Sequence, residues 1–227
     1  MPVMPTEFDA LLRSPALLKA ALDFNGLAAP DCATPELRFL AQNPRVRRFL
    51  RPPMPETAVW CFEPKPNRLA LLPLPFLARL LSYWSAAVWA EDLARIIEKN
   101  RLLPILEWLG PDVYRYAARR GRFQLGGLRA GFRRGEDGEN PADARNRAEM
   151  ENWLTDVFPR PGNEMFALCL ARWPQPLRAA WEKRWQRALP QAGRDAAAFS
   201  SFPAAWRWLE KMLTSEVAPE WQPCFNS

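Results

Sequence analysis

The hydrophobic positions in the middle of the chain recur at the spacing of an amphipathic helix. From one leucine, apolar residues follow after three, four, seven and eleven positions: Leu77, Leu80, Leu81, Trp84 and Val88. These separations place the side chains on one face, because an α-helix turns once every 3.6 residues. Pro73 precedes the pattern, and proline is favoured at the start of a helix. The sequence therefore predicts a helix that begins near Pro73 and buries this face in a core.

Three shorter apolar patterns follow this helix and predict three more helical segments. Their apolar residues are Leu93, Ile96 and Ile97 in the first, Leu102, Ile105, Leu106 and Leu109 in the second, and Val113, Tyr116 and Ala117 in the third. The second segment is expected to stop at Gly110-Pro111, because glycine commonly follows the last helical residue. Four short amphipathic segments with brief connections predict a compact helical core.

Helix starts also occur outside this region. Asn140-Pro141 followed by Asp143 combines a cap, a first-position proline and an early acid, and we expect that helix to run through Trp153 to Phe158. The other starts are Thr34-Pro35-Glu36 and, with weaker signals, Ser14-Pro15 and Phe202-Pro203.

Sheet signals are nearly absent, because alternating runs rich in β-branched residues hardly occur. Prolines between residues 52 and 66 mark a non-helical connection. We therefore expect an all-α protein, a compact irregular bundle of short amphipathic helices with proline-rich connections. Residues 1–227 are predicted to form a single helical domain, with a mobile loop at 121–140 and a C-terminal helical part at 141–227, for which a separate subdomain stays open.

The composition limits the chemistry available to the chain. Its 227 residues are 48% hydrophobic and 25% charged, which are globular values, and they include no histidine. Histidine is the usual general base near neutral pH and the commonest metal ligand, so triad and zinc-hydrolase chemistry is excluded. Gly121 and Gly126 have the outer spacing of a phosphate loop, but Gly127-Leu128 replaces the required lysine and hydroxyl. We expect no enzyme activity, no cofactor and no metal.

The apolar segment at residues 69–90 raises the alternative of a membrane span. It contains Pro73, Pro75 and Arg79, and its uncharged part is too short to cross a bilayer. The four cysteines are scattered, and the first residues lack a signal-peptide pattern. These features favour a core helix and a cytoplasmic location.

Residues 69–128 resemble the YscK family, also called SctK, of bacterial type III secretion systems. The resemblance rests on 60 residues that include Leu71-Leu72-Pro73-Leu74-Pro75, Leu93-Ala94-Arg95-Ile96-Ile97, Leu109-Gly110 and Tyr114-Arg115-Tyr116-Ala117. It implies a helical accessory protein of the cytoplasmic sorting platform, located at the cytoplasmic face of the inner membrane through the secretion apparatus. The implied partners are the pod protein (SctQ type) and the cytoplasmic domain of the inner-membrane ring protein (SctD type), and indirectly the stator-like regulator and the ATPase. The family has no catalytic motif, so the resemblance implies no active-site residue.

Arginines form the strongest local charge feature, between Asp112 and Glu136. They are Arg115, Arg119, Arg120, Arg122, Arg129, Arg133 and Arg134, in a chain whose net charge is +6. One interpretation is a solvated helix end, because Arg119-Arg120-Gly121 would complement a helix C-terminus. The other is docking onto an acidic partner surface, since the planar guanidinium pairs well with carboxylates.

Tryptophans supply the other candidate binding residues. Trp206 and Trp208 are two positions apart, so on a helix they are not expected to face one core together. One of them, together with Trp221, is a candidate interface anchor, because tryptophan is enriched at binding hot spots.

Two other functions stay open. A basic nucleic-acid-binding protein would place the arginines on phosphates and exposed aromatics on bases. A peripheral membrane protein would lay residues 45–51, which combine arginines with apolar residues, on anionic lipid. The favoured interpretation of this segment is a short core helix with Val46, Phe49 and Leu50 on its inner face.

Overall fold

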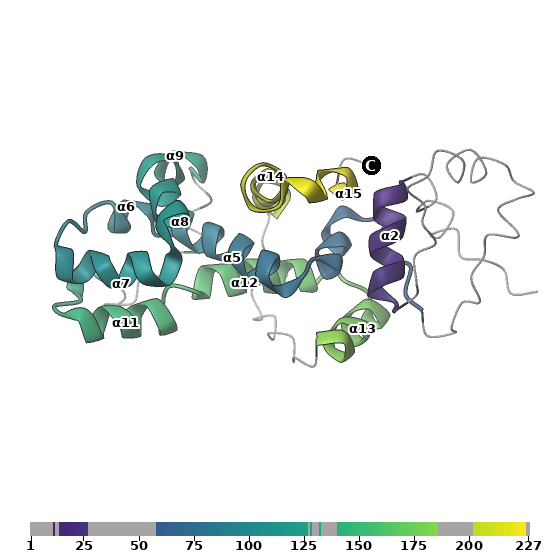
Figure 1. Cartoon of the computed structure of the whole chain (residues 1–227), viewed down its shortest axis with the longest axis horizontal. Coiled ribbons are helices and arrows are strands. Elements are labelled where there is room, and N and C mark those ends of the chain that lie inside the picture. Colours follow the sequence, from purple (N-terminus) through teal and green to yellow (C-terminus); the bar gives the residue numbers. More distant parts are fainter. Residues whose placement is uncertain are drawn as a thin grey trace, which may run out of the picture. The chain divides into compact units, whose positions relative to one another are not determined.

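The computed structural model describes residues 11, 14–26, 58–126, 128, 132, 140–185 and 202–225 (Figure 1). Within these ranges every regular element is helical and no strand occurs, so the predicted all-α class is confirmed. No helix in the described part of the chain is long and apolar enough to cross a membrane.

The described residues divide into two compact units. The first contains residues 11, 14–26, 58–72, 172–185 and 218–225, and the second contains residues 73–126, 128, 132, 140–171 and 202–217. Each unit therefore combines segments that are distant in the sequence. None of the unit boundaries falls at residue 141, where the sequence suggested a C-terminal part.

The described residues of the first unit form five short elements. They are α2 (Pro15–Phe24), η1 (Lys65–Leu71), α13 (Gln175–Trp185), η6 (Pro219–Trp221) and α15 (Gln222–Phe225). Ser14 caps α2, as predicted, by accepting a hydrogen bond from the amide of Leu17. At the other end of α2, Arg184 donates to the carbonyls of Asp23 and Phe24, where a cation complements the helix dipole.

Arg68 connects the segments of the first unit. Its side chain is only 5% exposed, and it donates to the carbonyls of Phe62 (2.9 Å), Glu63 (3.0 Å) and Cys224 (2.7 Å). A buried guanidinium needs such acceptors, because an unpaired buried charge is strongly destabilising. This residue thereby joins η1 to α15, which lies more than 150 positions later in the chain.

The second unit is built around α5 (Leu74–Val88). As predicted, this helix follows Pro73 and buries Leu77, Leu80, Trp84 and Val88, whereas Leu81 is half-buried. It packs against α12 (Arg160–Leu170), which runs beside it (Figure 1). The amide of Gly162 on α12 donates to the Ser85 hydroxyl on α5 at 3.0 Å.

The second unit also contains the remaining described elements. They are α6 (Ala90–Leu93), α7 (Lys99–Leu109), α8 (Pro111–Tyr116), η2 (Ala117–Gly121), α9 (Arg122–Gln124), η3 (Pro141–Asp143), α11 (Arg147–Asp156), α14 (Phe202–Met212) and η5 (Leu213–Val217).

The predicted stop at Gly110 is confirmed, because Gly110 has a φ of 79° and separates α7 from α8. The predicted segment that carries Leu93, Ile96 and Ile97 is wrong beyond Leu93: α6 stops at Leu93, so Ile96 and Ile97 are not helical and Ile97 is 85% exposed.

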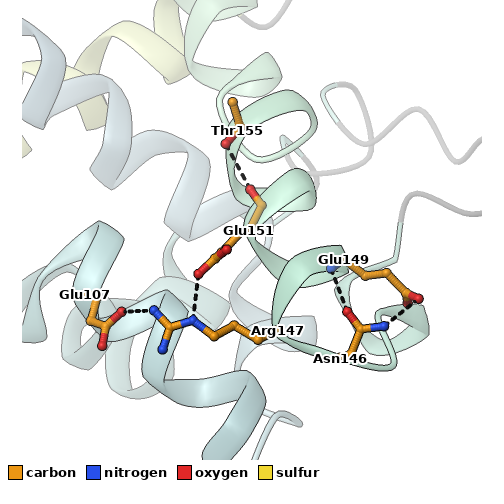
Figure 2. Close-up of polar contacts among 6 residues, drawn as sticks. All are labelled: Glu107, Asn146, Arg147, Glu149, Glu151 and Thr155. Carbon is orange, nitrogen blue, oxygen red and sulfur yellow. Dashed lines mark hydrogen bonds and ion pairs between the residues drawn. The ribbon is translucent and has the colours of Figure 1, made fainter.

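The predicted helix start at Asn140 is also wrong. The Asn140 side chain caps only the single 3₁₀ turn η3, whereas the helix begins at Arg147 behind a second cap, Asn146. Asn146 accepts from the amide of Glu149 and donates to its carboxylate (Figure 2). The first of these bonds satisfies a backbone amide that a helix start otherwise leaves without a partner, and the second holds the Asn146 side chain in place.

The helix that follows this cap lies beside α7 (Figure 1). Arg147 joins the two helices by pairing with Glu107 on α7 at 2.6 Å and with Glu151 one turn along its own helix at 2.7 Å (Figure 2). The two carboxylates raise the pKa of the Arg147 guanidinium, and the hydrogen bond to Glu151 is the largest single cause.

The expected mobile loop at 121–140 begins inside helical structure. Gly121 ends η2 and is followed directly by α9, so the first four residues of the expected loop are helical. Residues 127, 129–131 and 133–139 lie outside the described part of the chain.

Candidate protein-binding site

An arginine-lined pocket of about 300 Å³ lies in the second unit. Its lining residues come from α5, α8, η2 and η5, and they are Arg79, Tyr83, Asp112, Arg115, Tyr116, Arg119, Arg120 and Glu216. We call this feature the arginine pocket.

One continuous helical segment supplies most of the lining. The chain passes from α8 into η2, a five-residue π turn, without a break. Arg115 and Tyr116 follow Asp112 by three and four positions, and Arg119 and Arg120 follow those two by four positions each. These helical spacings bring the side chains to one side of the segment. Single π turns inside α-helices occur frequently at functional sites, and η2, between α8 and α9, is a turn of this kind, whereas η5 is a π turn at the end of α14.

Gly121 lets this segment approach α5 closely. A Cβ atom at this position would lie 3.2 Å from the Cα of Ala87 and 3.2 Å from the Cβ of Ala90. The small residues at the contact therefore allow η2 to lie against the end of α5 and the start of α6, which places Arg119 and Arg120 beside the residues of α5.

Two tyrosines form the aromatic part of the lining. The rings of Tyr83 and Tyr116 meet edge to face with centroids 5.1 Å apart, a favourable geometry for aromatic pairs. The Tyr116 hydroxyl donates to Oε1 of Gln124 at 2.8 Å, which ties α9 to α8. Burial raises the pKa of Tyr116 well above its ordinary value of 10.0, so this phenol is neutral at physiological pH.

The charges of the arginine pocket are unevenly matched. Asp112 lies 3.7 Å from Arg79 and 3.4 Å from Arg115, so one carboxylate is shared by two guanidinium groups. Arg120 pairs with Glu216 at 2.9 Å. Arg119 forms no ion pair with any residue that the structure describes, so four arginines face only two acids.

Three of the predicted site residues are brought together here, namely Arg115, Arg119 and Arg120. Arg122 follows on α9 outside the pocket, where its guanidinium lies 4.4 Å from the ring centroid of Phe123. Arg129, Arg133 and Arg134 lie outside the described residues. The interpretation of Arg119-Arg120-Gly121 as a helix end is wrong, because Gly121 is buried and α9 continues the helical path.

The structure also corrects the prediction for the tryptophans. Trp206 and Trp208 on α14 are both buried, each 8% exposed. Trp206 stacks on Phe202, whereas Trp208 meets Trp84 edge to face at 5.0 Å and also approaches Tyr116. Aromatic neighbours cover two sides of this helix, so both positions face packed side chains and offer little surface to a partner. Trp221, in the first unit, is half-buried.

Sequence reasoning missed five of the lining residues as site residues, namely Arg79, Tyr83, Asp112, Tyr116 and Glu216. Arg79 and Tyr83 lie on α5, four positions apart and thus on one helix face, and the Arg79 guanidinium is 6.0 Å from the Tyr83 ring centroid. Glu216 comes from a turn almost a hundred positions after Arg120. Helical spacing could have paired the first two with each other, but no local signal connects Glu216 to the arginines.

Comparison of the chain with family models, curated proteins and solved structures finds no match. Among the described residues, no group of three or more potential ligands is placed to hold a metal ion.

Proposed function

We propose that this chain is a non-enzymatic adaptor that binds acidic surfaces of partner proteins through the arginine pocket. The observation that carries the proposal is the gathering of Arg79, Arg115, Arg119 and Arg120 around one hollow with only two carboxylates between them. A concave surface with excess positive charge favours a negatively charged partner and accelerates its encounter with the chain.

Arginine suits this task better than lysine. Its guanidinium is planar, remains charged at any physiological pH, and presents donors in a fixed fork that matches a carboxylate. All four cationic residues of the arginine pocket are arginines. The helices and turns that carry them have buried residues on their other sides, so the side chains project from ordered elements.

We further propose that the adaptor acts in the sorting platform of a type III secretion system. This part of the proposal is supported by the resemblance of residues 69–128 to the YscK/SctK family. The arginine pocket draws all four of its arginines and both tyrosines from α5, α8 and η2, which lie inside that segment. The proposed partners are the pod protein and the cytoplasmic domain of the inner-membrane ring protein, and the proposed location is the cytoplasmic face of the inner membrane.

The proposal is tested by recovering partners from the bacterium that carries the gene. A tagged chain is expressed at its native level, nuclease is added to remove nucleic-acid bridges, and bound proteins are identified by mass spectrometry. Recovery of the pod and ring proteins is the expected result. Recovery of neither, in cells that assemble a secretion apparatus, contradicts the proposed assembly. Loss of all bound partners on nuclease treatment would favour the nucleic-acid alternative instead.

A further inference from the structure

We infer that the arginine pocket takes two carboxylates of one acidic peptide segment, one on Arg119 and one on Arg120, from which it displaces Glu216. This inference rests on the proposed function and adds the chemical class of the ligand and the internal group that competes with it. The partner segment would be an extended stretch rich in glutamate or aspartate.

The first carboxylate has an open position in the arginine pocket. Arg119 is exposed and forms no ion pair among the described residues, although it lies four positions from Arg115 on the same side of the helical segment. Asp112 does not satisfy the neighbouring arginines fully, because it is shared and its distances to Arg79 and Arg115 are 3.7 and 3.4 Å. An incoming carboxylate at Arg119 therefore meets excess positive charge.

The second position is occupied by the protein's own carboxylate. Glu216 lies 2.9 Å from Nη1 of Arg120, which is hydrogen-bonding distance, so the geometry of the pocket accepts a carboxylate there. Both partners are accessible, with side-chain exposures of 64% for Arg120 and 37% for Glu216. Exposed ion pairs contribute little to stability, so a partner's carboxylate can replace Glu216 at small cost.

The turn that carries Glu216 is held independently of this ion pair. Leu213 and Val217, at the two ends of η5, are buried, whereas Glu216 between them is exposed. Release of the Glu216 side chain therefore requires a change of rotamer and no loss of packing by the turn. Two π turns from distant parts of the sequence meet at this pair, one with the cation and one with the acid.

A carboxylate fits the arginine pocket better than a phosphate does. Both anionic groups that the pocket arginines already hold are carboxylates. Phosphate sites commonly use free amide groups at a helix start, but here Asp112 occupies the first turn of α8 and would repel a dianion. The Tyr83 phenol also lines the pocket and can donate a hydrogen bond to a carboxylate.

The test measures binding of a fluorescent hexaglutamate peptide to the full chain at low salt, with inorganic phosphate as competitor. Glu216→Gln removes the internal carboxylate and is expected to tighten binding about threefold to fivefold, the size of one exposed ion pair. Arg119→Gln is expected to weaken binding by a similar factor. Glu220→Gln makes the same charge change at an exposed position outside the pocket and is expected to leave the affinity unchanged.

Several results would overturn the inference. They are equal or weaker binding by Glu216→Gln, an equal gain by Glu220→Gln, and inorganic phosphate binding more tightly than the peptide. Thermal unfolding of each variant shows whether a changed affinity reflects a changed fold. If the native partners are recovered but Glu216→Gln does not change the affinity for the peptide, the displacement of Glu216 from Arg120 is wrong while the adaptor proposal stands. If the peptide does not bind and substitution of the pocket arginines does not alter partner recovery, both the inference and the adaptor proposal are wrong.

Discussion

Gly162 on α12 lies so close to Leu81 on α5 that a Cβ atom at this position would be 2.8 Å from the Leu81 carbonyl oxygen and 2.9 Å from the Ser85 hydroxyl. Ordinary side-chain contacts are longer, so only glycine permits the two helices to approach this closely. The backbone oxygen cannot move away by a simple rotation, unlike the end of a flexible side chain. The close contact between α5 and α12 therefore requires glycine at position 162.

Gly162→Ala is expected to destabilise the protein by roughly 1–3 kcal/mol, because the added methyl group forces α5 and α12 apart. The helix propensity of alanine offsets little of this strain, because Gly162 lies in the first turn of α12 and the benefit of about 1 kcal/mol applies to a helix interior. Urea denaturation followed by circular dichroism measures the change in free energy of unfolding. Gly121→Ala is the comparison, since its Cβ would meet Ala87 and Ala90 at 3.2 Å and less displacement is needed. A stabilised Gly162→Ala protein would contradict the close contact.

Arg68→Met is expected to destabilise the first unit by about 3 kcal/mol or more. The substitution leaves the carbonyls of Phe62, Glu63 and Cys224 without the donor that Arg68 supplies, in a buried position. Arg178→Met is the control, because the Arg178 side chain makes one hydrogen bond to the residues that the structure describes, to the Trp173 carbonyl, and is only half-buried. Equal losses in the two variants, measured by urea denaturation, would show that Arg68 does not join the segments.

The two polar groups at the start of α11 are expected to differ in importance (Figure 2). Asn146→Ala should lower the free energy of unfolding by about 1 kcal/mol, because the amide of Glu149 loses its cap. Arg147→Ala should lower the free energy of unfolding by less than this in the same urea denaturation, since Arg147 and both of its carboxylate partners are more than half exposed. A larger loss in Arg147→Ala than in Asn146→Ala would contradict this ranking.

Stability is expected to fall at alkaline pH. Burial raises the pKa of Tyr116 above 10.0 and that of the Cys224 thiol above 9.0, so the folded state keeps protons that the unfolded state releases. The loss therefore begins near pH 9 and steepens above pH 10. Urea midpoints measured between pH 8 and pH 11 should show this slope. Tyr116→Phe should flatten it above pH 10, and an unchanged slope would show that Tyr116 is not responsible.

Helical periodicity predicted the fold class and α5 well, because those features depend on local spacing. Prediction failed where a neighbouring residue decided the outcome. Asn140 and Asn146 are both plausible caps, and the reciprocal bonds with Glu149 select the second. Trp206 and Trp208 are both buried because aromatic residues surround two sides of α14, which spacing along one helix does not reveal.

The arginine pocket was predictable only in part. Arg115, Arg119 and Arg120 stand close together in the sequence, so their charge was evident. Arg79 and Glu216 reach the same place from other helices, and only the tertiary packing of α5, η2 and η5 brings them there. Glu216 changes the interpretation of the binding site most, because its carboxylate already pairs with Arg120, to which a partner would bind.

The most direct test of the adaptor account measures binding between the purified chain and the purified pod and ring-protein domains by calorimetry. The triple variant Arg115→Gln, Arg119→Gln and Arg120→Gln removes three charges of the arginine pocket. The matched control, Arg95→Gln, Arg145→Gln and Arg207→Gln, removes three exposed arginines of the same unit outside the pocket. The account predicts that the pocket variant stays folded and loses at least tenfold in affinity for one partner, about 1.4 kcal/mol, while the control binds normally. Unchanged affinity of the folded pocket variant for both partners would contradict it.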